Sequence, residues 1–182
     1  MGKLSDHLTQ FHKDFIAEQK MFFVATAPKK GKINISPKGI NSIEVVDDKT
    51  LVWLNLTGSG NETAAHLLED NRITIMMNAF EGNPMILRIY GTAESIHQHD
   101  QEWSSYINLF PPSNGARNII KVKIESVMSS CGFGVPIMEY KEERTELTNW
   151  AEKKGPDGIK AYQKEKNVIS LDGKPTELFE KD

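Results

Sequence analysis

The chain has 182 residues, with 22 lysines and arginines against 25 aspartates and glutamates, so its formal net charge is −3. This length favours one domain with a sizeable core, and the charge lacks the basic excess typical of nucleic-acid-binding proteins. No apolar run is long enough to cross a bilayer, and the single cysteine, Cys131, excludes an intrachain disulfide and a cysteine zinc cluster. We therefore expect one cytoplasmic domain over residues 1–182, with no membrane or nucleic-acid partner.

Hydrophobic spacing predicts a helix and then closely spaced strands in the first half of the chain. Residues 5–20 have the pattern of an amphipathic helix, with Ser5 as its N-cap. Strand-like apolar runs, separated by turn sequences, follow at residues 21–27, 33–36, 42–47 and 51–56. Residues 61–71 then read as a short helix that Asn61 could cap.

The second half continues with strands and ends in helices. Further strands are predicted at residues 72–80, 85–95 and 117–128, with a helix at 99–110 and an irregular, glycine-bearing segment at 129–140. A C-terminal helical extension over 142–182 should contain helices at 142–155 and 156–167, separated by Gly155, and a polar end that is extended or frayed. About six short strands at this spacing favour a mainly β fold, an antiparallel barrel with peripheral helices, over a doubly wound parallel sheet.

Two polar loops carry groups that can hold a phosphate. Residues 57–63, Thr-Gly-Ser-Gly-Asn-Glu-Thr, lie between a strand and a helix start, where backbone N–H groups and hydroxyls attract anions. The other segment, residues 34–39, ends the strand predicted at 33–36, on which Asn34 and Ser36 share one face, and Lys38 offers a point charge. General statistics favour the simpler interpretations, an ordinary strand-to-helix connection and a solvated turn.

A few further side chains could carry chemistry, each with a simpler explanation. Arg88, inside an apolar strand, must pair, bind a ligand or face outward. His97 and His99 form a His-x-His pair for which surface polarity at a strand end is favoured over a metal site, and His66 is expected to be a packing histidine. Cys131 has no activating neighbour in sequence. No side chain is nominated as a catalytic acid, base or nucleophile, and no metal site is expected.

Four stretches, taken together, resemble a known family. They are "INISPKGIN" at 33–41, "LVWLNLTGSGNETAAHLLEDNRITIMM" at 51–77, "PMILRIYGTAE" at 84–94 and "SSCGFGVPIMEY" at 129–140. Their order and spacing, from about Phe22 to Pro175, are similar to those of the pyridoxamine 5′-phosphate oxidase-like family of FMN-binding split barrels. Within it, the chain resembles the poorly characterised branch that carries Ser-Pro-Lys-Gly and Gly-Ser-Gly-Asn-Glu-Thr.

The resemblance implies a fold, a cofactor and a partner. The fold would be a six-stranded antiparallel split β-barrel that forms a homodimer, with FMN in the subunit interface. The strand that ends at Lys38 and the loop from Asn55 to Thr63 would cradle one FMN. The implied contacts are Asn34, Ile35 and Ser36 along the flavin ring edge; Lys38, Ser59, Asn61 and Thr63 around the phosphate; Asn55 and Thr57 in the same loop; and, from the partner subunit, Arg88 and the segment 131–135 with Cys131 and Phe133.

Two departures separate the chain from the vitamin B6 oxidases of this family. Those enzymes carry a basic Ser-Arg-Lys stretch where this sequence has Gly60-Asn61-Glu62, and an Arg-x-His substrate motif that no arginine here begins. The resemblance therefore implies an FMN-dependent oxidoreductase with another substrate, with a reduced substrate or NAD(P)H as electron donor.

Two other functions remain open at this stage. The first is a binding protein without turnover that holds FMN, a deazaflavin or haem; haem would need an axial ligand such as His66 or His99. The second is a ligand-free dimer whose loops are structural, in which case added FMN would not raise the melting temperature.

Overall fold

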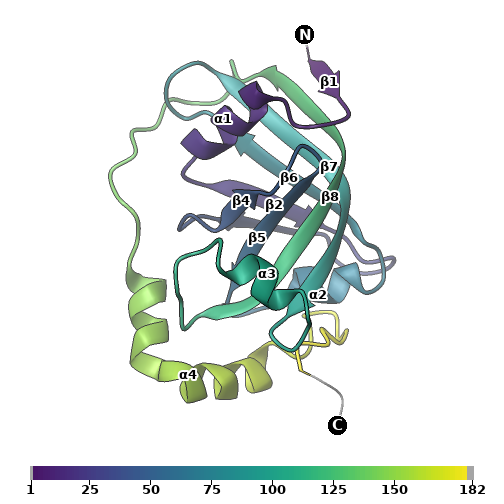
Figure 1. The fold of residues 1–182 in the computed structure, drawn as a ribbon, viewed down its shortest axis with the longest axis vertical. Helices are drawn as coiled ribbons and strands as arrows, with labels where there is room; N and C mark the ends of the chain where they lie inside the picture. Colours follow the sequence, from purple (N-terminus) through teal and green to yellow (C-terminus); the bar gives the residue numbers. More distant parts are fainter. Residues whose placement is uncertain (1, 180–182) are drawn as a thin grey trace.

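One curled antiparallel sheet organises residues 2–179, the part of the chain that the computed structural model describes (Figure 1). Its eight strands are β1 (Lys3–Ser5), β2 (Phe22–Thr26), β3 (Asn34–Lys38), β4 (Ile43–Val45), β5 (Thr50–Leu56), β6 (Arg72–Asn78), β7 (Met85–His97) and β8 (Ala116–Cys131). The helices within these residues are α1 (Gln10–Glu18), α2 (Glu62–Leu67), α3 (Trp103–Ile107) and α4 (Glu146–Lys166). The predicted mainly β fold with peripheral helices is therefore confirmed.

The sheet curls without closing, so the predicted split barrel is also confirmed. Its strand order is β3-β2-β6-β7-β8-β5-β4, every pairing is antiparallel, and β1 pairs with β8 outside this path. The strands β3 and β4 follow each other in the chain, yet they lie at opposite ends of the strand order. The count differs from six because β1 and β4, of three residues each, join the longer strands.

The core fills the curl of the sheet. Residues that alternate along β2, β6 and β7, such as Val24, Ile75 and Leu87, are fully buried. Phe22 packs edge-on against Trp53, with ring centroids 6.2 Å apart. In β5 and in the first part of β8 both faces are buried, which explains their nearly continuous apolar sequences. These two strands are consequently held in place from both sides.

The helix boundaries differ from the sequence predictions at several ends. The first helix begins at Gln10 rather than at residue 5, because Thr9, not Ser5, is the N-cap and forms a capping box with His12. The predicted helix at 99–110 is reduced to the five residues of α3. The long strand β8 runs on to Cys131, so the irregular segment begins only after it.

The C-terminal extension follows the predicted division and is more ordered than expected. The helix α4 is interrupted at Gly155, whose φ is 65° and ψ 173°, as the sequence predicted, although it begins at Glu146 instead of residue 142. Thr176 and Leu178 are buried, so the polar end packs onto the protein as far as it is described. The last part of the predicted frayed end, residues 180–182, lies outside the described residues.

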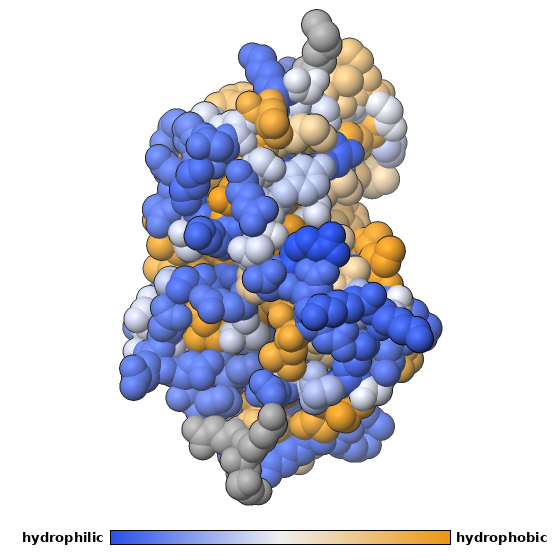
Figure 2. Space-filling model, turned by 90° about the vertical axis from the view of Figure 1, so that its right-hand side faces the viewer, coloured by the Kyte–Doolittle hydropathy of each residue, from blue (hydrophilic) through white to orange (hydrophobic). Residues whose placement is uncertain are grey.

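The surface is mixed in character. Hydrophilic residues cover most of the face in Figure 2, and apolar residues lie among them in separate patches. Among residues 2–179, no helix combines the length and the apolar composition needed to span a bilayer.

Candidate functional site

A polar cavity of about 310 Å³ joins the two sides of the open sheet. One side is the edge strand β3, and the other consists of the ends of β5 and β8 with the loop that leads into α2. The residues that line it are Asn34, Ser36, Lys38, Asn55, Leu56, Gly58, Ser59, Gly60, Asn61, Glu62, Thr63 and Arg117. Seven of the residues that the resemblance assigned to FMN thus lie around one cavity. Their role in binding stays a prediction.

The strand β3 directs alternate side chains into this cavity. Asn34, Ser36 and Lys38 are partly buried, whereas Ile35 between them is 68% exposed and does not line it. The Asn34 side-chain amide lies 3.5 Å from the Thr63 hydroxyl across the cavity. Period-2 alternation therefore accounts for the first half of the site.

The loop after β5 is fixed from behind. The Thr57 backbone N–H donates to the Gly115 carbonyl at 2.7 Å, and the Thr57 hydroxyl accepts from Gln163 at 2.7 Å. Thr57 is fully buried and does not line the cavity, so it holds the loop rather than facing a ligand.

Asn61 takes the N-cap position of α2, but its side chain does not cap the helix. It donates instead to the Asn167 carbonyl oxygen at 3.3 Å and accepts from the Asn55 amide at 3.5 Å. Asn55 also donates to Asn118, which donates to Ser95. Asn61 is therefore the N-cap residue, as predicted, but its side chain makes no cap hydrogen bond, because longer-range partners take up the amide. With only six residues, α2 is too short for its dipole to dominate the site.

The positive charge of the cavity comes from two buried side chains. Burial and the neighbouring Arg117 lower the pKa of Lys38 to about 8. Burial also lowers the pKa of Arg117 to about 10. Its Nη1 donates to the Gly60 carbonyl and to Asn167 Oδ1, both at 2.8 Å, and these acceptors are neutral. Within residues 2–179, no carboxylate forms an ion pair with either cation.

Two lining residues also hold polar atoms without a partner. Ser36 Oγ and Arg117 Nε are buried and make no hydrogen bond within the described residues. Buried polar atoms in proteins are nearly always paired, and a buried charge requires compensation. An anion with several oxygen acceptors would pair with both cations and with the unpaired Arg117 Nε–H at once. The cavity therefore fits a phosphate group.

Sequence reasoning missed Arg117 and Asn167. The only signal for Arg117 was its position in the alternating run 117–128, where it shares a face with the buried Ile119. The arginine predicted to contact a ligand was Arg88, which donates to the Ser130 hydroxyl at 3.3 Å and does not line this cavity.

Cys131 and Phe133 lie away from the cavity and are exposed. The resemblance placed them, with Arg88, in the pocket of the partner subunit, and this placement stays a prediction.

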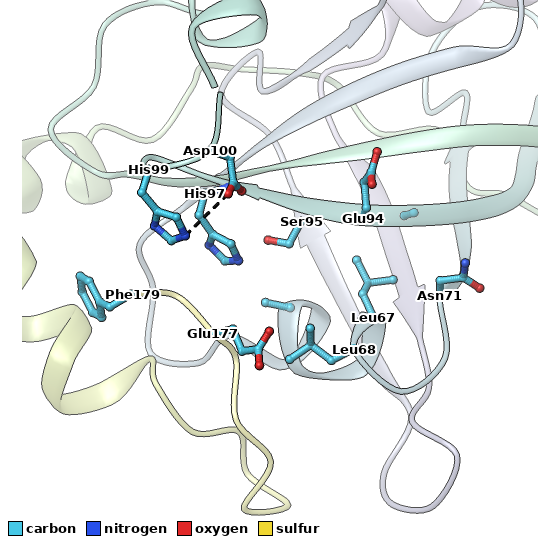
Figure 3. A pocket seen from close by; sticks show the side chains of 12 residues that line it. Leu67, Leu68, Asn71, Glu94, Ser95, His97, His99, Asp100, Glu177 and Phe179 are labelled. Carbon is cyan, nitrogen blue, oxygen red and sulfur yellow. Dashed lines mark hydrogen bonds and ion pairs between the residues drawn. The ribbon is translucent and has the colours of Figure 1, made fainter. Parts of the chain in front are cut away.

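A second cavity, of about 600 Å³, lies between α2, the end of β7 and the C-terminal segment (Figure 3). The rings of His97 and His99 stack there with centroids 5.4 Å apart, and burial lowers the pKa of His97. His97 is thus buried and not part of a solvated strand end, contrary to the sequence interpretation. Among the described residues, no group of three histidine, cysteine or acidic side chains could hold a metal ion. His66 is buried, as expected of a packing histidine, and its Nδ1 lies at hydrogen-bond distance, 3.0 Å, from the Thr26 hydroxyl, but its buried Nε2 has no partner among the described residues.

A third and larger cavity, of about 980 Å³, shares Lys38 with the polar cavity. It is lined by the end of α1, the end of β3, the turn after β6 and the segment that leads to α4. Met21, Phe80 and Met138 give it apolar surface, and Tyr140 adds an aromatic ring. Lys38 therefore stands between a small polar space and a wide, partly apolar one.

Comparison with known sequences identifies relatives. A family model described as pyridoxamine 5′-phosphate oxidase matches residues 8–131. A pyridoxamine 5′-phosphate oxidase family protein of Aspergillus flavus, ustO, is 35% identical over 190 aligned residues, which cover 94% of this chain and 75% of that protein.

Solved structures share the architecture. HupZ of Group A Streptococcus is 25% identical with a TM-score of 0.51, over 66% of this chain and 91% of that one. A Lactobacillus delbrueckii protein, provisionally named a pyridoxamine 5′-phosphate oxidase, is 21% identical with a TM-score of 0.52, over 68% of this chain and 94% of that one. Both likenesses agree with the open antiparallel barrel.

Proposed function

Because the chain belongs to the pyridoxamine 5′-phosphate oxidase family, we propose that it is an FMN-binding oxidoreductase whose substrate is not pyridoxamine 5′-phosphate. One observation carries the proposal: the partly buried Lys38 and the buried Arg117 place two positive charges in the same polar cavity, and among the described residues no carboxylate forms an ion pair with either. The phosphate of FMN carries close to two negative charges at neutral pH, since its second pKa is about 6 by analogy with phosphorylated side chains. It would neutralise both cations.

The lining residues have distinct tasks in this proposal. Lys38 and Arg117 hold the phosphate, and Ser59, Asn61 and Thr63 supply further polar contacts to it. Asn34 and Ser36 run along the flavin ring edge, where the unpaired Ser36 hydroxyl can donate a hydrogen bond, and Ile35 between them contributes only its backbone, since its side chain faces away from the cavity. Asn55 and Thr57 hold the loop in place through their own buried contacts.

When bound, the flavin supplies the capacity to accept a hydride or electrons and pass them on, while the chain's residues bind and orient. The cavity of about 980 Å³ beside Lys38 has room for a reduced substrate or NAD(P)H. The stretch Gly60-Asn61-Glu62 lacks the two basic residues of the vitamin B6 oxidases, and no arginine begins an Arg-x-His motif. Both differences support another substrate.

We also propose that a second copy of the chain closes the site. The strand β3 is an edge strand, and the apolar residues Ile33 and Ile35 at its outer face are 72% and 68% exposed. Phe133 and Ile137, in the segment after β8, are 82% and 91% exposed. In this arrangement the partner subunit contributes Arg88 and the segment 131–135 to the pocket. The exposed, free Cys131 is compatible with a cytoplasmic location.

The visible absorption spectrum of the purified protein, with mass spectrometry of whatever heat releases, tests the cofactor. A two-banded yellow spectrum and the mass of FMN support the proposal, and bleaching by NADH, NADPH or a panel of reduced substrates supports oxidoreductase activity. A Soret band would indicate that the bound cofactor is haem and not FMN. A colourless protein whose melting temperature does not respond to added FMN would overturn the proposal.

A further inference from the structure

The C-terminal part of the chain, beyond the residues that the family model matches, holds the phosphate-facing loop. Besides the bond from Gln163 to Thr57, the Asn167 side-chain amide donates to the Gly58 carbonyl at 3.0 Å, and the Leu171 N–H donates to the Glu62 carboxylate at 3.0 Å. In Figure 1 the second half of α4 and the residues after it lie at the end of the sheet where α2 begins. The loop 57–62 is therefore fixed by residues about a hundred positions further along the chain.

Asn167 is the central contact of this arrangement. It is fully buried, and its Oδ1 accepts from Arg117 Nη1 at 2.8 Å while its Nδ2 binds the loop. Its backbone carbonyl accepts from the Asn61 amide at 3.3 Å and from the Thr176 hydroxyl at 2.7 Å. One residue thus connects the guanidinium, the loop and the C-terminal segment.

The neutrality of this acceptor matters. A buried guanidinium is usually oriented by a carboxylate, which also cancels its charge. Asn167 orients Arg117 through a carbonyl oxygen and leaves the charge in place. The other acceptor of Arg117, the Gly60 carbonyl, is neutral as well.

We propose that Asn167 is a positioning residue that keeps the charge of Arg117 available to a phosphate, so that the C-terminal extension sets the preference of this site for phosphorylated over unphosphorylated flavin. This inference rests on the proposed function. An aspartate at position 167 would form an internal ion pair with Arg117 and compete with the ligand phosphate. An alanine would leave the charge but remove its orientation.

The test compares the affinities of FMN and riboflavin, measured by titration of the full-length apoprotein with flavin fluorescence as the signal. Asn167→Asp should weaken FMN binding by about 10- to 100-fold, the range of a charged hydrogen-bonded contact, and leave riboflavin affinity within about threefold. The variant also loses the hydrogen bond to Gly58, which affects the two flavins alike. This loss therefore does not change the ratio of the riboflavin dissociation constant to the FMN dissociation constant. Asn167→Ala should reduce the same ratio by only a few-fold.

Asn149→Asp is the matched control, because it makes the same charge change at an exposed residue in the first half of α4, whose side-chain amide donates to the Thr145 hydroxyl and which does not line the polar cavity. It should keep the wild-type ratio. The inference is wrong, and Asn167 only structural, if Asn167→Asp keeps the wild-type ratio. The same conclusion follows if FMN and riboflavin lose affinity equally in both Asn167 variants. Should the aspartate variant fail to fold, an unchanged ratio in the alanine variant overturns the inference by itself.

Failure of the proposed function gives a different result. Wild-type protein that binds neither flavin refutes FMN binding, and the positioning role is then tested with inorganic phosphate as the probe. Phosphate should raise the wild-type melting temperature and have no effect on Asn167→Asp. Equal responses of the two proteins, or no response of either, would overturn the inference.

Discussion

Replacing Arg117 by methionine should separate cofactor affinity from stability. The change removes one of two cations in the polar cavity and the buried, unpaired Nε–H. A hydrogen bond to a charged group contributes about 1.5–3 kcal/mol, so FMN affinity should fall by about 10- to 150-fold. Riboflavin, which lacks the phosphate, should bind the variant about as well as it binds the wild type.

The stability of the apoprotein should change little, because two effects oppose each other. Burial brings the pKa of Arg117 well below its ordinary value, to about 10, which corresponds to roughly 3 kcal/mol against its charged form. Its removal relieves that penalty but leaves the buried Asn167 Oδ1 without its donor, at about 1–3 kcal/mol, whereas the carbonyl of the exposed, cavity-lining Gly60 can be hydrated. The melting temperature of the ligand-free variant should therefore stay within about 5 °C of the wild-type value.

Isothermal titration with FMN and with riboflavin, together with thermal unfolding of the apoprotein, measures both quantities. Arg72→Met is the control, since Arg72 is exposed, pairs with Asp70 and lies outside the cavity. The reasoning is refuted if Arg117→Met binds FMN within threefold of the wild type, or if riboflavin loses as much affinity as FMN.

Three further changes test other parts of the structure. The pKa of Lys38 in the ligand-free protein is about 8, below the ordinary 10.5, so its amine loses its proton above pH 8. FMN affinity should therefore be level from about pH 7 to 8 and fall by up to about tenfold per pH unit above 8. Calorimetry at each pH checks this, and Lys38→Met should remove the pH dependence. Over pH 8–10.5 the stability of the apoprotein should rise instead. In this range Lys38 is neutral in the folded state but still protonated in the unfolded state, so each rise in pH favours the folded state. Ser36→Ala should leave the apoprotein melting temperature unchanged and weaken FMN and riboflavin alike by about 2- to 10-fold, and full retention of both affinities would exclude a flavin contact. Gly91→Ala should destabilise the fold by about 1–3 kcal/mol, because a Cβ there would overlap the Lys123 carbonyl oxygen at the bulge between β7 and β8. Gly134→Ala is the control: a Cβ at Gly134 would lie in open space, so this variant should keep the wild-type melting temperature.

Local patterns predicted the half of the site that depends on local structure. Alternation along β3 placed Asn34 and Ser36 on one face, with Lys38 as a nearby point charge, and the structure brings these three side chains to one cavity. The break at Gly155 was equally visible in the sequence, because a glycine followed by proline interrupts a helix. The N-cap of α1 was misplaced because Ser5 and Thr9 both suit a helix start, and only the pairing of Lys3–Ser5 with β8 decides between them.

Contacts between distant parts of the chain could not be predicted in this way. The role of Arg117 depends on β8 pairing with β5, which brings its guanidinium to Gly60. Asn167 acts on Gly58 across 109 residues of sequence, and nothing in its helix-end surroundings marks it. Sequence spacing describes one element at a time, whereas these residues meet only after the sheet has curled and α4 has returned to it.

The positive charge that the loop 60–62 lacks relative to the vitamin B6 oxidases can be supplied by a residue that is distant in sequence but close in space. Where those enzymes carry a basic stretch, this chain has Gly60-Asn61-Glu62, and the resemblance alone implied a loss of positive charge there. Yet the guanidinium of Arg117 donates to the Gly60 carbonyl at 2.8 Å, so a cation from β8 lies beside this stretch of the loop. A phosphate needs positive charge and hydrogen-bond donors near its oxygens, and the strand that supplies them is immaterial to the electrostatics. In the proposed arrangement, the altered motif is therefore compatible with phosphate binding, and the substrate is to be sought in the cavity of about 980 Å³ beside Lys38.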